Sequence, residues 1–153
     1  LLLMIFRSSK NNDRIGKTLK ELTYINELTL TVGLFMAAIG TFLGGVWANE
    51  SWGRYWGWDP KETWALVIVL FYAMLLHLRF IPKANGKYLF NTLALFGFST
   101  VIMTYFGVNY YLSGLHSYAA GDPVPIPTYV PITVLVASFI AIIAYFRNRK
   151  YVK

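Results

Sequence analysis

Long apolar stretches dominate this sequence and restrict the folds open to it. A helix needs about 20 apolar residues to cross the roughly 30 Å of hydrocarbon in a bilayer. Four stretches meet that requirement, at about residues 27–47, 63–81, 88–112 and 129–146. Hydrophobic residues make up 56% of the chain and charged residues only 14%, unlike a soluble globular domain. We therefore expect an all-α, polytopic transmembrane helix bundle, with residues 1–153 forming a single membrane domain.

The first six residues are apolar and resemble the last turns of a further span. They lack the charged region that opens a signal peptide. We therefore expect about four spans plus the end of a preceding one, in a fragment of a larger protein.

Basic residues predict the orientation of these spans, because short loops rich in Lys and Arg stay on the cytoplasmic side of a membrane. They precede the first span, separate the second from the third and follow the fourth, whereas only Arg54 and Lys61 lie elsewhere. The 47–64 segment and the 113–128 loop are then external, and the C-terminus is cytoplasmic. The net charge of +7 follows from this topology, so membrane lipid is an expected partner and nucleic acid is not.

All five tryptophans fall within residues 47–64: Trp47, Trp52, Trp56, Trp58 and Trp64. An aromatic belt would place such residues at both membrane faces, whereas these five share one segment. Their large flat rings therefore favour an external wall for a planar aromatic ligand. We expect Gly53 and Gly57 to let a ligand approach the backbone, and Arg54 and Lys61 to bind its acidic groups.

Two further patterns have structural interpretations. Asp59, Pro60 and Glu62 match an N-cap, a first helical residue and a capping box, so the second span should begin there. Small residues on the first span, including Gly40 and Gly44, predict close packing against another helix.

The two histidines are candidate metal ligands at different depths. His77 lies near the inner end of the second span, where an ionisable group is costly and commonly functional. His116 belongs to the external loop and shares its side of the membrane with the tryptophans. About 20 Å of helix separates the two levels, so one metal centre cannot take both. If each binds haem iron, the second axial ligands must come from elsewhere.

Three motifs together resemble a known family. They are WGRYWGWDPKETW at 52–64, LHLR at 76–79, and GVNY followed by GLHSY within 107–118. In this combination the chain resembles, over about residues 25–150, the C-terminal part of the CcsA or ResC-type subunit of the System II cytochrome c synthase, in the tryptophan-rich WWD family of haem-handling proteins.

The resemblance implies that haem b is carried through the membrane and held externally. His116 would be an axial ligand and the catalytic residue of the outer site, and His77 a ligand of an inner site. The residues expected to bind haem are Trp47, Trp52, Arg54, Trp56, Trp58, Asp59, Trp64, His77 and His116.

The implied enzyme is a cytochrome c haem lyase, or synthase, which joins haem to the thiols of a CXXCH motif in an exported apocytochrome c. The implied partners are a CcsB or ResB-type subunit or fused half, the apocytochrome, and thiol-reducing proteins that act on it. The chain has no cysteine, so every thiol must come from a partner. The expected location is a bacterial inner membrane, or a thylakoid membrane in a plastid, and this fragment alone should not be competent.

Three alternatives remain at this point. A System I haem-handling protein of the CcmC or CcmF kind shares the tryptophan-rich segment. A b-type electron-transfer cytochrome would need histidines paired across helices at one depth, and this sequence has no such pair. A structural membrane subunit would bind no haem.

Overall fold

The computed structural model describes residues 1–84, 86–112, 114–116 and 125–151, and within these ranges it is helical without strands. The helices are α1 (Leu2–Ile5), α2 (Asn12–Trp52), α3 (Pro60–His77), α4 (Lys87–Ile102), α5 (Val108–Tyr111) and α6 (Tyr129–Arg149). A 3₁₀ turn, η1 (Leu78–Phe80), extends α3, and a π-helical segment, η2 (Met103–Gly107), joins α4 to α5. The expected all-α fold is confirmed.

Four helical segments are long and apolar enough to cross a membrane: Asn12–Trp52, Pro60–Phe80, Lys87–Tyr111 and Tyr129–Arg149. In each, at most 11% of the apolar window is buried inside the protein. Because so much continuous apolar surface would be unstable in water, its environment is lipid, and the chain is an integral membrane protein.

The first span differs most from its predicted bounds. A helix of 41 residues replaces the expected 21, because polar residues on both sides of the apolar stretch also continue the helix. The helix begins at Asn12, and its first turns contain Lys, Leu and Glu, which are good helix formers. It ends at Trp52, since Gly53 adopts a left-handed φ of 70° and donates its N–H to the Asn49 carbonyl.

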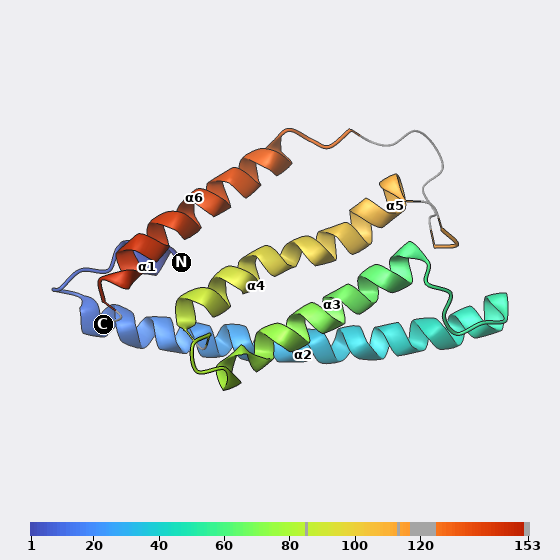
Figure 1. Cartoon of the computed structure of the whole chain (residues 1–153), viewed down its shortest axis with the longest axis horizontal. Coiled ribbons are helices and arrows are strands. Elements are labelled where there is room, and N and C mark those ends of the chain that lie inside the picture. The colour runs from blue at the N-terminus through green and yellow to red at the C-terminus, as the bar shows by residue number, and fades with distance from the viewer. Residues whose placement is uncertain (85, 113, 117–124, 152–153) are drawn as a thin grey trace.

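Helices α2, α3 and α4 form the main bundle, while α6 packs against α1 and touches α4 (Figure 1). Tyr72, Leu75 and Leu78 are buried where α3 meets α2 and α4. A hydrogen bond from Asn26 to Asn91 also joins α2 directly to α4. Both termini lie at the end of the bundle that carries the α3–α4 connection, and the tryptophan-rich segment lies at the opposite end (Figure 1).

The small-residue face of α2 does not pack as predicted. A Cβ placed on Gly33, Gly40 or Gly44 would meet no described atom within 4 Å. Gly40 and Gly44 instead line a cavity together with residues of α3. The expectation of close helix contact at these glycines was therefore wrong among the described residues, because a cavity lies between Gly40 and Gly44 of α2 and the residues of α3 that face them.

Candidate functional site

The site forms where α2 ends, the 53–59 loop leads into α3, and residues 114–116, which follow α5 in the chain, reach the start of α3. Asp59 starts α3 as predicted: its side chain accepts hydrogen bonds from the backbone N–H groups of Lys61, at 2.9 Å, and Glu62, at 3.2 Å. The Glu62 carboxylate accepts in return from Asp59 N–H, which completes the capping box.

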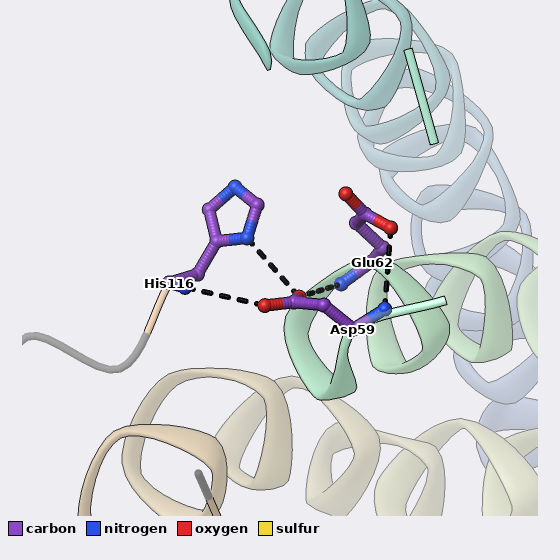
Figure 2. A group of neighbouring side chains, drawn as sticks. All are labelled: Asp59, Glu62 and His116. Atoms are coloured by element: carbon purple, nitrogen blue, oxygen red, sulfur yellow. Dashed lines mark hydrogen bonds and ion pairs between the residues drawn. The ribbon is translucent and has the colours of Figure 1, made fainter. Parts of the chain in front are cut away.

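The same Asp59 carboxylate also holds His116 (Figure 2). The His116 backbone N–H donates to Oδ2 at 3.2 Å, and the ring Nδ1 lies 3.1 Å from Oδ1. The ring contact is an ion-pair distance whose angle falls short of a hydrogen bond. Gly114 lies so near that an added Cβ would be 2.7 Å from Oδ2, so only glycine allows this approach.

These contacts decide the ionisation of Asp59. Burial alone would raise the pKa of its carboxyl group, since the side chain is only 6% exposed. The hydrogen bond from Glu62 N–H, with the contacts from the ring and backbone N–H of His116, outweighs burial and lowers the pKa below its usual value. Asp59 is therefore a carboxylate at neutral pH.

Two tryptophans surround the ring of His116. Trp52 meets it edge-on with centroids 4.6 Å apart, and Trp47 lies 6.3 Å away. The two tryptophans also contact each other edge-on at 5.0 Å. Because α2 places both rings on its last turns, the end of α2 and the 114–116 segment are joined through aromatic packing.

The remaining tryptophans are arranged differently. Trp56 and Trp58 make a separate edge-on pair at 5.8 Å. Trp58 is 70% exposed and has a left-handed φ of 58°, which is unfavourable for a bulky side chain. Trp64 is partly buried on the second turn of α3 and makes no ring contact with the other four. The cluster thus comprises two pairs and a single ring.

Arg54 and Lys61, the two cations of the tryptophan-rich segment, both have polar or aromatic partners. Arg54 lies over the Trp52 ring at 5.9 Å, and its Nη1 is 3.5 Å from a Glu62 oxygen. Lys61 Nζ donates to Asn109 at 3.0 Å, which ties the start of α3 to α5. The Arg54 guanidinium also fills the space beside Gly57, where an added Cβ would be 1.3 Å from Nη1. Gly57 therefore accommodates Arg54, contrary to the expectation that its backbone is open to a ligand.

A cavity of about 390 Å³ opens beside this cluster. The small-residue face of α2 lines one side, and Trp56, Lys61, Glu62 and His116 line the other. Trp56 Nε1 is buried there without a hydrogen-bond partner among the described residues. An indole N–H in that state is suited to a polar group on a bound molecule.

His77 lies far from this cluster, as expected. It is the last residue of α3, whose 18 residues extend about 27 Å from the end that carries Asp59. The ring is exposed, and its Nδ1 is 2.7 Å from the Ala73 carbonyl, which can only accept. Nδ1 therefore carries the proton, leaving the Nε2 lone pair available to a metal.

Sequence reasoning placed His116 near the tryptophans but missed its contact with Asp59 and the role of Asn109. Asp59 and His116 are 57 residues apart, so no local pattern reports their contact. The glycine before the histidine in the GLH motif was the available signal, since Gly114 permits the approach. Ser117 and most of the predicted 113–128 loop lie outside the described residues.

Comparison with known proteins gives consistent similarities. The model of the cytochrome C assembly protein family matches residues 1–116. The chain is 58% identical over 111 residues to protein NrfI of Wolinella succinogenes, covering 72% of this chain and 12% of that protein. It is 45% identical over 107 residues to cytochrome c biogenesis protein CcsA of Marchantia polymorpha, covering 70% of this chain and 33% of that protein.

A CcsA protein of Prochlorococcus marinus is 44% identical over 99 residues, which covers 65% of this chain and 32% of the relative. The chain thus spans about a third of the length of these CcsA relatives. The family match extends from α1 to His116 and so includes both the tryptophan-rich segment and the candidate histidines. The chain belongs to the cytochrome C assembly protein family.

Proposed function

We propose that this chain is part of a membrane-bound cytochrome c haem lyase that holds haem at its external face for attachment to an apocytochrome c. The carrying observation is the position of His116, enclosed by Trp47, Trp52 and the Asp59 carboxylate at the edge of the 390 Å³ cavity. The family and the CcsA relatives support a role in cytochrome c assembly.

The residues of this site fit haem as a substrate. The second ring nitrogen of His116 is directed away from Asp59 (Figure 2), and no described group bonds to it. Imidazole nitrogen is a common axial ligand of haem iron. Trp56 lines the cavity, and the exposed Trp58 packs edge-on against it, so both offer apolar surface to a porphyrin. Lys61, which lines the cavity, and Arg54 would supply positive charge for the propionates.

The proposed reaction adds two cysteine thiols of a CXXCH motif to the two haem vinyl groups. Each addition joins sulfur to one vinyl carbon and places the thiol proton on the other, so no oxidant is consumed. The protein's contribution is orientation, because holding haem and peptide in one geometry replaces the entropy of their encounter. His116 would hold one axial position and leave the other to the histidine of the motif.

His77 would serve an inner haem site on the delivery path. Its protonated Nδ1 bonds to Ala73 and its Nε2 is available, which suits coordination. The described residues contain only these two histidines, so the second axial ligands come from the rest of the protein or from a CcsB or ResB-type partner. The predicted cytoplasmic position of the basic loops puts His77 near the inner face.

Two variants of the full-length protein with its partner test this assignment. His116→Ala should bind outer haem poorly and lose thioether formation, whereas His77→Ala should deliver too little haem to an outer site that is itself intact. Haem supplied at the external face should therefore restore cytochrome maturation in His77→Ala more than in His116→Ala. Equal restoration in both, or normal maturation in either one, would contradict the assignment.

A further inference from the structure

One buried carboxylate serves two separate structural elements. Asp59 accepts two backbone N–H groups at the start of α3 and contacts both the backbone and the ring of His116. Capping alone would be satisfied by serine, threonine or asparagine. An aspartate that is 94% buried carries a desolvation cost that capping does not require. The contact with His116 is the feature for which the negative charge matters.

The 114–116 segment is fitted closely against this carboxylate. Gly114 lies against Asp59 and Pro60, where no side chain fits. Two residues later, His116 donates its backbone N–H to Oδ2 of Asp59. The His116 side chain is only 17% exposed and is enclosed by Trp47 and Trp52 on its other sides. The ring therefore has one nitrogen facing the carboxylate and one facing away (Figure 2).

We propose that Asp59 is the positioning residue that fixes the orientation and the electron-donor strength of His116 as a ligand of the outer haem. This inference rests on the proposed function. A carboxylate beside Nδ1 holds the proton on that nitrogen, leaves the Nε2 lone pair for iron and makes the imidazole a stronger donor. The present angle falls short of a hydrogen bond, and such contacts tighten when a ligand binds.

A stronger imidazole donor stabilises ferric iron more than ferrous iron. Asp59 should therefore lower the reduction potential of the outer haem. Losing the carboxylate charge should weaken the ferric complex about tenfold relative to the ferrous complex, since histidine partners of this kind change metal affinity by about 10- to 100-fold. A tenfold change in that ratio is a rise of about 59 mV for a one-electron couple.

The test is a redox titration of the outer haem in the full-length protein with its partner, comparing Asp59→Asn with Glu62→Gln. Asparagine is as good an N-cap as aspartate, so α3 should still begin at the same residue. Glu62→Gln is the matched control, because it also removes one negative charge and the Glu62 carboxylate lies within 4.8 Å of both Asp59 and the His116 ring. Among the described residues, no hydrogen bond or ion pair joins Glu62 to His116.

We expect Asp59→Asn to raise the potential by the amount above and Glu62→Gln to change it by less than half as much. Equal shifts in both variants would overturn the inference, because general charge loss would then explain them. An unchanged potential in Asp59→Asn would also overturn it. His116→Ala, measured in parallel, separates the two proposals: if outer haem is bound and ligated normally without His116, the proposed function itself fails.

Discussion

Replacing Trp52 should release the His116 ring without removing a residue that lines the cavity. Trp52 contacts His116 and Trp47 edge-on, at 4.6 and 5.0 Å, and carries Arg54 over its ring. Of these contacts, only the one with His116 is lost when His116 leaves its position, and an aromatic pair of this kind contributes about 0.5 to 1.5 kcal/mol. Since 1.4 kcal/mol is a factor of ten, Trp52→Ala should raise the population with a displaced His116 by about 2- to 12-fold.

The assay is the absorption spectrum of haem bound to the full-length protein. Axial ligation by His116 should give way to a form that lacks this ligand in Trp52→Ala, while Trp52→Phe should keep most of it because a ring remains. Trp58→Ala is the contrasting variant, since Trp58 is 70% exposed and its one ring contact among the described residues is with Trp56. It should lower haem content but leave the ligation of the remaining haem unchanged.

Replacing Trp56 together with Trp58 should lower haem occupancy by about tenfold or more, because two large aromatic faces are lost. Membrane insertion should be normal in all of these variants. Wild-type haem ligation in Trp52→Ala would contradict this role of Trp52, as would a change of ligation in Trp58→Ala as large as that in Trp52→Ala.

Three other outcomes are expected. The folded-state pKa of Asp59 is lowered, so its carboxylate stabilises the contact with His116 above the unfolded pKa and loses this effect as the pH falls through the folded pKa. An acid-induced change in the haem spectrum below about pH 4 should therefore be present in the wild type and absent in Asp59→Asn. Gly40→Leu should fill the cavity and reduce haem content in membranes, whereas Gly40→Ala should not, because nothing lies within 4 Å of the added Cβ. A reporter fused after Lys153 should be active only in the cytoplasm and one inserted within residues 119–122 only outside; the reverse pattern would place the tryptophans on the wrong side.

Much of the fold was predictable because its signals are local. Helix α3 began and capped as its Asp-Pro-Lys-Glu sequence indicated, and the four apolar stretches became four helices. The length of α2 was underestimated, since hydropathy marks the lipid-facing part of a helix and not its polar continuation. The π-helical segment in the third span was not predicted; in it the Met103 side chain lies against Gly107, a contact that hydropathy does not report.

The site was less predictable because its geometry is tertiary. Local sequence placed five tryptophans in one segment, yet their division into pairs depends on where α2 ends and how the following loop turns. The engagement of Arg54 with Glu62 and Trp52 likewise joins residues on different elements. The contact between Asp59 and His116 spans 57 residues and could be found only from the folded chain.

The left-handed backbone of Trp58 has a consequence for attempts to stabilise this protein. A non-glycine residue at φ 58° costs of the order of 1 kcal/mol, and a glycine there would relieve that cost. Glycine at this position should therefore give the more stable fold, because the tryptophan ring is 70% exposed and contributes little burial energy. Selection for thermal stability should accordingly enrich Trp58→Gly, and we expect these variants to be more stable but to support less cytochrome maturation.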